Sequence, residues 1–256
     1  MLTKSQIKYL RNLQKKKYRE KENKFLFEGY RIIEEALNAN FNLTKIFISN
    51  NSKTNLNIKK IITLSRKKNI PLEIISYLSL EKISDTKHHQ GIIALADLPN
   101  YNNALQDNQI LALYKISDPG NLGTLLRTAI WFGVKTVILS DECVDPFNPK
   151  VVRSSMGAHC FLNSIVPVEM DKTLSLLQSQ DYSIIGAEVD GFSIEKFKVD
   201  SIKKWVLVIG GETSGIPASI KKQINHHVSI PGKENIDSLN AAIAGGILLQ
   251  KLTKMN

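Results

Sequence analysis

Two patterns of hydrophobic residues alternate along this chain: short apolar runs, and longer stretches with an apolar residue every three to four positions. The runs predict buried strands, and the stretches predict amphipathic helices. An apolar segment followed by a helix ("FLFEGYRIIEEALN") comes first. Further strands are predicted at 43–49, 71–76 and 91–96, with helices at 56–68 and 78–83. This alternation predicts a small α/β domain over residues 23–98.

A polar, turn-forming stretch follows this first domain. The sequence "DLPNYNNALQDNQ" contains one proline and four asparagines, which is typical of a linker, and we place the linker at 99–108. Beyond it, strands are predicted at 109–115, 136–139, 164–168, 182–187, 204–209 and 227–230, and helices at 121–133, 149–157, 172–180 and 237–253. Strands separated by helices predict a mostly parallel sheet covered on both faces, over residues 109–256. In such a sheet, ligands bind at the loops that leave the carboxyl ends of the strands.

The composition is that of a globular protein. Hydrophobic residues make up 43% of the chain, but no uninterrupted apolar segment approaches the roughly 20 residues that cross a bilayer. Neither a secretory nor a transit signal is evident, so we expect a cytoplasmic protein that binds no membrane. Cys143 and Cys160 lack CxxC spacing, which argues against a zinc site and a disulfide framework. The adjacent histidine pairs have side chains that diverge on a strand, and we assign no metal.

The net charge of +10 is concentrated at the N-terminus. Residues 1–24 contain two acidic residues and nine basic ones: Lys4, Lys8, Arg11, Lys15, Lys16, Lys17, Arg19, Lys21 and Lys24. Such a block attracts polyphosphate backbones of any sequence, and the alternative is a solubilising tail. Ile7, Leu10 and Leu13 recur near helical spacing, so this arm, residues 1–22, is predicted to form a short helix with one apolar edge.

The first candidate loop is "DPGNLGTLLRTAIWFG", in which a glycine turn leads from a strand into a helix. A dinucleotide fingerprint needs G-x-G-x-x-G, and Gly120 and Gly123 have the wrong spacing. The acids Asp141 and Glu142 do end the next strand, so a nicotinamide site remains an alternative. The apolar residues of the helix form one stripe, and Arg127 falls outside its centre, facing solvent or a cleft. A surface arginine without function is the other interpretation.

Two further loops carry glycine and polar residues. In "WVLVIGGETSGIP" Gly210 and the glycine after it let the backbone approach a ligand closely, with Glu212 beside them. An ordinary turn with a surface glutamate is equally compatible. In "VSIPGKENIDSLNAAIAGGILLQ" a strand ends, and Asn235 or Asp237 is expected to cap a helix with Ser238 and Asn240 in its first turn.

The last helix contains two adjacent glycines, Gly245 and Gly246. Each costs about 1 kcal/mol relative to alanine in a helix interior. We therefore expect both to be offset by close packing of the helix on the sheet.

Taken in order, the three loops resemble the motifs of the SpoU-class, TrmH-like RNA ribose 2′-O-methyltransferases of the SPOUT superfamily. The matching residues are Asn121-x-Gly123-x-x-x-Arg127, Gly210-x-Glu212-x-x-Gly215, and Ile230-Pro231 followed by Ser238-Leu239-Asn240. The resemblance covers residues 105–256, and 23–98 resembles the small ribosomal-protein-like RNA-binding domain that many members carry. The chain departs from the family in having Gly232 where methionine is usual, and "SLNAAIAGG" in place of "SLNVSVAAG".

The resemblance implies a deep trefoil knot in the C-terminal domain, an exception to the rule that chains are not knotted. It implies a homodimer whose active site takes residues from both subunits. It also implies methyl transfer from S-adenosylmethionine to a ribose 2′-hydroxyl of structured RNA, with large-subunit ribosomal RNA as the expected target. The residues that match the catalytic set are Asn121, Arg127, Glu212, Ser238 and Asn240. Backbone groups of Gly210, Ile230 and Leu239 are expected to hold the donor.

Arg127 has been regarded in this family as the general base, but a guanidinium keeps its proton to a pH above about 12. We therefore expect Arg127 to clamp the target phosphate and to stabilise charge developing on the 2′-oxygen. Lys150 and Arg153 are candidate RNA-backbone contacts, or else surface residues. The alternatives to a ribosomal RNA methyltransferase are an RNA-binding protein that kept the fold without catalysis, and a tRNA ribose methyltransferase.

Overall fold

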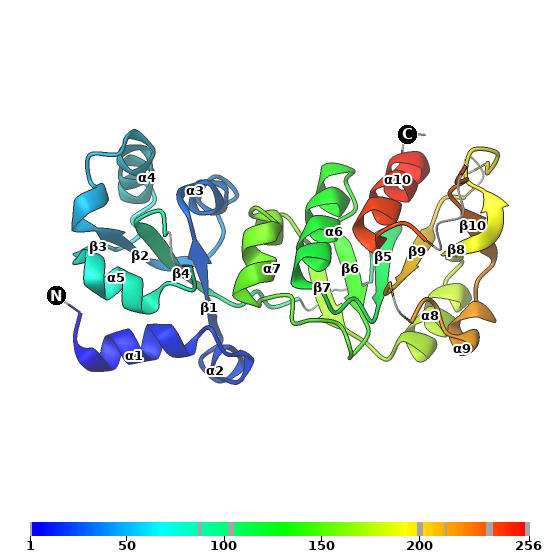
Figure 1. Ribbon diagram of the computed structural model, residues 1–256, viewed down its shortest axis with the longest axis horizontal. Coiled ribbons are helices and arrows are strands. Elements are labelled where there is room, and N and C mark those ends of the chain that lie inside the picture. Colours follow the sequence, from blue (N-terminus) through cyan, green and yellow to red (C-terminus); the bar gives the residue numbers. More distant parts are fainter. Residues whose placement is uncertain are drawn as a thin grey trace. The chain divides into compact units, whose positions relative to one another are not determined.

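A computed structural model describes residues 2–86, 89–101, 105–198, 202–212, 214–233 and 238–253. The chain forms two compact units (Figure 1). The first comprises Met1–Asn100 and Asp145–Cys160, and the second comprises Tyr101–Val144 and Phe161–Asn256. Residues 145–160, which the sequence assigned to the second domain, thus pack with the first unit. The boundaries at 22, 98 and 108 stay predictions.

The first unit contains a four-stranded mixed sheet. Its strands, in spatial order, are β1 (Lys24–Glu28), β4 (Ile92–Asp97), β2 (Leu43–Ser49) and β3 (Leu72–Ile75). β4 is antiparallel to both of its neighbours, and β3 is parallel to β2. The helices of this unit are α1 (Lys4–Asn12), α2 (Lys16–Glu22), α3 (Tyr30–Asn38), α4 (Leu56–Lys67), α5 (Tyr77–Ile83) and α7 (Pro149–Ser154), with 3-10 turns η1 (Asn50–Ser52) and η2 (Ala158–Cys160). The predicted alternation of strands and helices is confirmed here.

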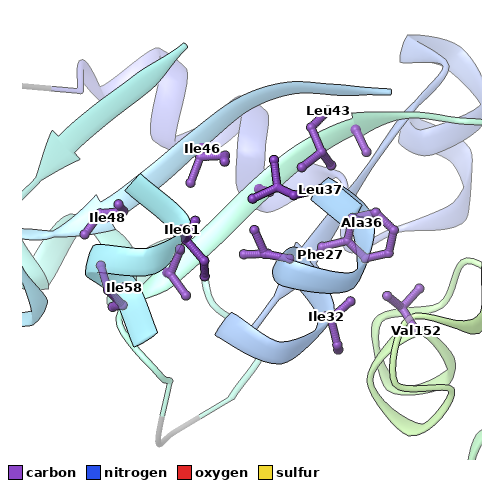
Figure 2. Close-up of a cluster of buried hydrophobic side chains, with 14 of the residues drawn as sticks. Phe27, Ile32, Ala36, Leu37, Leu43, Ile46, Ile48, Ile58, Ile61 and Val152 are labelled. Atoms are coloured by element: carbon purple, nitrogen blue, oxygen red, sulfur yellow. The ribbon is translucent and has the colours of Figure 1, made fainter. Parts of the chain in front are cut away.

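A hydrophobic core lies on each face of this sheet. Phe27 on one face packs with Ile32 and Ala36 of α3, and Figure 2 shows Val152 of α7 in the same cluster. Leu26, one residue from Phe27, packs instead in the cluster formed by α1 and α5. Side chains alternate between faces along a strand, so the apolar run of β1 supplies both cores.

The predicted N-terminal arm forms two helices that belong to the first unit. Thr3 and Gln6 make a capping box at the start of α1, and Leu10 and Leu13 are buried, which confirms the predicted helix with one apolar edge. Arg19 of α2 is only 3% exposed, because it donates to the carbonyl of Leu13 and pairs with Asp145. Arg19 is therefore excluded from the basic residues that a polyphosphate can reach.

The second unit contains a six-stranded sheet in which every neighbouring pair is parallel. Its strands, in spatial order, are β10 (His226–Ser229), β8 (Ser183–Ser193), β9 (Trp205–Gly210), β5 (Gln109–Tyr114), β6 (Thr136–Leu139) and β7 (Ser164–Pro167). Its helices are α6 (Pro119–Trp131), α8 (Met170–Ser179), α9 (Ala218–Lys221) and α10 (Ala241–Thr253). The predicted parallel sheet is confirmed, while α9 and the extension of β8 beyond residue 187 were not predicted.

Helices cover both faces of this sheet. Ile110 and Ala112 of β5 lie in a cluster with Leu174 of α8. Leu111 and Leu113 are equally buried, and by alternation they point to the other face, where α6 and α10 pack together (Figure 1). Burial on both faces explains why β5 reads as a continuous apolar run.

The last helix differs from its prediction. α10 begins at Ala241 rather than at residue 237, because the side chain of Asn240 accepts hydrogen bonds from the backbone amides of Ala242 and Ile243 at 3.0 and 3.3 Å. Asn240 is therefore a cap and not a first-turn residue. The other candidate caps, at 235 and 237, lie outside the described residues. So does part of the segment between β10 and α10, and the trefoil knot stays a prediction.

The glycines of α10 also differ from each other. A Cβ at Gly245 would lie 2.4 Å from Leu125 Cδ2, whereas one at Gly246 would meet nothing closer than Thr128 Cγ2 at 3.6 Å. The expectation of close packing is thus confirmed for Gly245 and wrong for Gly246. None of the helices in the described ranges has the length and apolar character needed to cross a membrane.

Candidate active site

The order of the strands brings the first two candidate loops together. β5 and β9 are neighbours, and their last residues, Tyr114 and Gly210, pair in the ladder. From β5 the chain continues to β6 on one side, while β9 lies on the other side. Such a change of direction is where parallel sheets bind their ligands, beyond the carboxyl ends of the strands. The loops that carry Asn121 and Glu212 begin here.

Three polar side chains from the three loops form one hydrogen-bonded network. Asn121 Nδ2 donates to Glu212 Oε1 at 2.9 Å. Asn240 Nδ2 donates to Asn121 Oδ1 at 3.0 Å and also to Glu212 Oε1. Since Asn240 also caps α10 and the amide of Asn121 lies in the first turn of α6, the network links the N-termini of both helices to the turn after β9.

The start of α6 is fixed by its own cap. Asp118 Oδ1 accepts from the backbone N–H of Asn121 at 2.8 Å, and Pro119 occupies the first helical turn, where a missing N–H costs no hydrogen bond. The sequence "DPGN" therefore specifies both the helix start and the position from which the Asn121 side chain projects.

The glycines of the second loop allow backbones to approach closely. A Cβ at Gly210 would lie 2.3 Å from the carbonyl carbon of Gly215, and one at Gly211 would lie 2.4 Å from the carbonyl oxygen of Lys115. Both obstacles are backbone atoms, which cannot move aside as a side chain does. The loop after β9 thus folds back on itself and against the loop after β5, and no other residue type fits at 210 or 211.

The residues expected to hold the donor lie at the ends of secondary-structure elements. Gly210 ends β9, Ile230 follows β10 and Leu239 precedes the cap of α10. Within the described part of the chain, the backbone groups of Ile230 and Leu239 make no hydrogen bond, and the Leu239 side chain is 47% exposed. Ser238 is also exposed. This region therefore offers unpaired amides and carbonyls beside exposed apolar surface.

Arg127 does not join the network. It is exposed on α6, as its position outside the apolar stripe predicts, and it forms no hydrogen bond or ion pair with another described residue. At about 100° per residue, Arg127 points to a different side of α6 from Asn121. It instead shares a side with Trp131, one turn later, which is 81% exposed.

Ser140 and Cys143, which the sequence did not assign to the site, hold the loop after β5. Ser140 Oγ accepts from the backbone N–H of Lys115 at 2.9 Å, and Cys143 Sγ accepts from that of Ile116 at 3.4 Å. Burial raises the pKa of the Cys143 thiol, so this cysteine stays protonated and structural. A small polar residue directly after a buried strand was the available sign of such an anchor.

Other candidate residues take on structural roles. Glu142, weighed as a ribose-binding acid, pairs with Lys115 at 2.7 Å, a hydrogen bond that raises the pKa of that lysine. Arg153, weighed as an RNA contact, lies in the first unit and pairs with Asp85 at 2.8 Å. Across the described ranges, no three His, Cys, Asp or Glu side chains gather as metal ligands.

Comparison with family models finds two matches. Residues 108–250 match the SpoU rRNA Methylase family, and residues 4–94 match the MRM3-like substrate binding domain. The two matches together cover both units, including all three loops described above.

Individual proteins are similar over nearly the whole chain. The 23S rRNA (guanosine(2553)-2′-O)-methyltransferase RlmP of Bacillus subtilis is 27% identical over 246 residues, which cover 96% of this chain and 95% of that protein. A solved structure from Porphyromonas gingivalis, assigned to the TrmH family of RNA methyltransferases, is 30% identical with a TM-score of 0.86 and covers 100% of both chains. The AdoMet-bound rRNA methyltransferase of Sinorhizobium meliloti is 24% identical, covers 99% of this chain and 96% of that one, and shares the fold with a TM-score of 0.84.

Proposed function

Because the chain belongs to the SpoU rRNA methylase family, and is thus an S-adenosylmethionine-dependent RNA 2′-O-ribose methyltransferase, we propose that its active site lies where the three loops meet. The observation that carries this proposal is the hydrogen-bonded network of Asn121, Glu212 and Asn240. Each of these three residues comes from a different motif loop, so the network joins the three loops at one edge of the parallel sheet.

The site fits the methyl donor. Gly210 and the glycine after it let the turns that follow β9 and β5 pack backbone against backbone, since a Cβ at either position would collide with backbone atoms. We propose that the donor binds beside these turns. Ile230 and Leu239 add backbone groups without a hydrogen-bond partner among the described residues, and the Leu239 side chain adds exposed apolar surface for an adenosine. When bound, S-adenosylmethionine supplies an electrophilic methyl group for in-line displacement by the ribose 2′-oxygen.

The network residues position the site. Asn121, Glu212 and Asn240 hydrogen-bond to one another and so hold the three loops in place. Their proposed contribution to catalysis is to align the two reactants. Ser238, exposed beside the network, is proposed to orient the RNA.

Arg127 is proposed as the clamp on the target phosphate. Its guanidinium is exposed, forms no ion pair with a described residue, and presents a planar donor fork that matches phosphate oxygens. Because Arg127 faces away from Asn121, we place it in the site of a second subunit. The enzyme is then a homodimer that takes Arg127 from one protomer and the network from its partner.

An exposed apolar surface supports the dimer. Trp131 on α6 is 81% exposed, and Ile243 and Ile247 on α10 are 55% and 38% exposed. α6 and α10 pack against each other, so these side chains extend one surface that also carries Arg127. Large exposed apolar surface of this kind marks protein interfaces.

Large-subunit ribosomal RNA is the proposed substrate, and the cytoplasm the proposed location. The RlmP relative acts on 23S rRNA by its name, and residues 4–94 match a substrate binding domain. The basic N-terminal helices suit a large structured RNA.

Transfer of a labelled methyl group from S-adenosylmethionine to purified ribosomal RNA tests the function. We expect label in a ribose of large-subunit RNA, and none when Arg127→Lys replaces the planar fork by a point charge. Donor binding by calorimetry without transfer to any RNA would instead identify a non-catalytic RNA-binding protein. Label in tRNA alone would identify the protein as a tRNA ribose methyltransferase.

Mixing two variants of low activity tests the shared site. Arg127→Ala and Glu212→Ala dimers, exchanged and recombined, should regain about a quarter of full activity, because half of the dimers are mixed and each holds one intact site. Failure to regain activity while mixed dimers are detected by mass would place Arg127 and Glu212 in the same protomer's site.

A further inference from the structure

The exposed side of α1 carries a stripe of cations. Lys4, Lys8 and Arg11 recur at intervals of four and three residues, so they project from one side of the helix. All three are exposed, and none forms an ion pair with a described residue. Some other cations of the N-terminal helices form ion pairs: Lys16 pairs with Glu20, and Arg19 is buried and pairs with Asp145.

The opposite side of α1 packs on the first unit beside α5. Leu10 of α1 is buried in one cluster with Leu80 and Ile83 of α5, and Gln14 Nε2 donates to the carbonyl of Ile83 at 2.7 Å. The two helices run side by side (Figure 1). Helix α1, which carries the stripe of cations on its exposed side, is thus packed beside α5 and is not a loose tail.

The exposed side of α5 carries an aromatic and an apolar residue beside the charged pair Glu81 and Lys82. Tyr77 is 40% exposed and Leu78 is 65% exposed, and neither is a member of the cluster that contains Leu80 and Ile83. The Tyr77 ring lies against His89, with centroids 4.7 Å apart and planes tilted by 41°. The imidazole of His89 is itself held, since its Nδ1 accepts from the backbone N–H of Gly91 at 3.2 Å.

We propose that the α1–α5 face, defined by Lys4, Lys8 and Arg11 with Tyr77 and Leu78, binds RNA at an unpaired nucleotide. The cations contact consecutive backbone phosphates, and the base stacks on Tyr77. Cations beside an exposed aromatic ring are the combination that single-stranded RNA requires, because every base presents a flat face for stacking and every nucleotide a phosphate. Glu81, exposed on α5, is an acid on this face, and the adjacent Lys82 balances it.

This inference rests on the proposed function for its biological role, but it is tested by binding alone. Affinity is measured by fluorescence anisotropy in the absence of methyl donor, with a labelled RNA hairpin that has an unpaired loop and with a blunt RNA duplex of equal phosphate number. Salt dependence is recorded for both. Methyl transfer and donor binding are assayed separately, so failure of one result does not decide the other.

Removing the stripe should weaken binding to both RNAs. For the triple variant Lys4→Gln, Lys8→Gln, Arg11→Gln, the slope of log affinity against log salt should fall by about 2 to 3, one unit or slightly less for each lost phosphate contact. The matched control is Lys59→Gln, Arg66→Gln, Lys67→Gln on α4, which removes the same charge from exposed residues on the other face of the sheet. Equal slopes for the two triple variants would overturn the proposal.

Removing the ring should weaken binding to the hairpin only. Tyr77→Ala is expected to lose about tenfold in affinity for the hairpin, the effect of one lost base stack, and to bind the duplex as the unchanged protein does. Tyr77→Phe keeps the ring and should retain affinity, which separates stacking from the hydroxyl. Circular dichroism verifies that each variant is folded. Unchanged hairpin affinity in folded Tyr77→Ala, or an equal loss for the duplex, would show that no base stacks here.

Discussion

At the scale of single residues, Asn240 is the side chain on which most of the candidate site depends. Its oxygen caps α10, and its amide donates to both Asn121 and Glu212. Glu212 accepts two hydrogen bonds on one oxygen and donates none. Removing the carboxylate would therefore take away the acceptor of the Asn121 amide and leave the Asn240 amide with Asn121 Oδ1 alone, so the turn after β9 would lose both of its bonds to the network.

We expect Glu212→Ala to lower kcat/KM at least tenfold and to weaken donor binding, because hydrogen bonds to charged groups hold the loops. Glu212→Gln keeps an acceptor oxygen and should lose less. Calorimetry and the methyl transfer assay measure both effects. Glu195→Ala, an exposed glutamate of the same unit, is the control. If the alanine variant binds donor and turns over as the control does, the network does not position the site.

His159 makes a pH-dependent contribution to stability. It is 1% exposed, shares a hydrogen bond with Ser155 Oγ and bonds the Pro146 carbonyl at 2.8 Å. Burial lowers its pKa from 6.5 to about 4. The unfolded chain therefore takes up this proton first as the pH falls, so the stabilisation is complete above pH 6.5 and is lost progressively toward pH 4.

Across that window, the His159→Gln variant should lose less stability than the unchanged protein, by about 3 kcal/mol at most. Urea unfolding at pH 7 and near pH 4.5, followed by circular dichroism, measures the difference. His226→Gln, a more exposed histidine, should keep the original pH dependence. Parallel pH profiles for His159→Gln and the unchanged protein would contradict a neutral buried imidazole.

At the scale of elements, α10 has two glycines in different surroundings. Gly245 faces Leu125 and Ile209, where an added Cβ would lie 2.4 and 2.8 Å from their terminal carbons. Gly246 faces Thr128 at an ordinary contact distance of 3.6 Å. Alanine at 246 would therefore gain helix propensity without a clash, whereas alanine at 245 would clash with neighbouring side chains.

Gly246→Ala should raise the free energy of unfolding by about 0.5 to 1 kcal/mol, the gain in helix propensity. Gly245→Ala should gain less or lose stability, because side chains on α6 and β9 must move. Denaturant unfolding of the two variants under one condition compares them directly. A larger gain at Gly245 than at Gly246 would show that α10 is not packed as described.

At the scale of the whole molecule, the exposed surface of Trp131, Ile243 and Ile247 is the proposed dimer interface. A carboxylate in place of the Trp131 side chain would remain unpaired inside the proposed dimer, which costs several kcal/mol of association free energy. We expect Trp131→Glu to be folded and monomeric in sedimentation experiments, with methyl transfer lost. Leu176→Glu on α8, another exposed apolar residue, should leave the oligomeric state unchanged. A dimer that persists in Trp131→Glu would place the interface elsewhere.

The sequence by itself determined the elements and the chemistry. The spacing of apolar residues and the turn-forming residues located most strands and helices. The strands of the parallel sheet were recognisable because burial on both faces leaves continuous apolar runs. Glycine at 210 and the polar residues at 121, 212 and 240 identified the loops through their resemblance to the motifs of a known family, and their position after predicted strands places them at carboxyl ends. The hydrophobic pattern gave the wrong start for α10, because the side chain of Asn240 caps this helix. A cap depends on the direction of one side chain, and the spacing of apolar residues carries no information about that direction.

Only the tertiary structure decided which residues meet. It joined Asn121, Glu212 and Asn240, separated Arg127 from them, and buried Arg19 within the basic arm. It also packed residues 145–160 with the first unit. These outcomes depend on strand order and on contacts between residues distant in sequence, whose free energies are set by burial in three dimensions, whereas local propensity acts only over a few neighbouring residues.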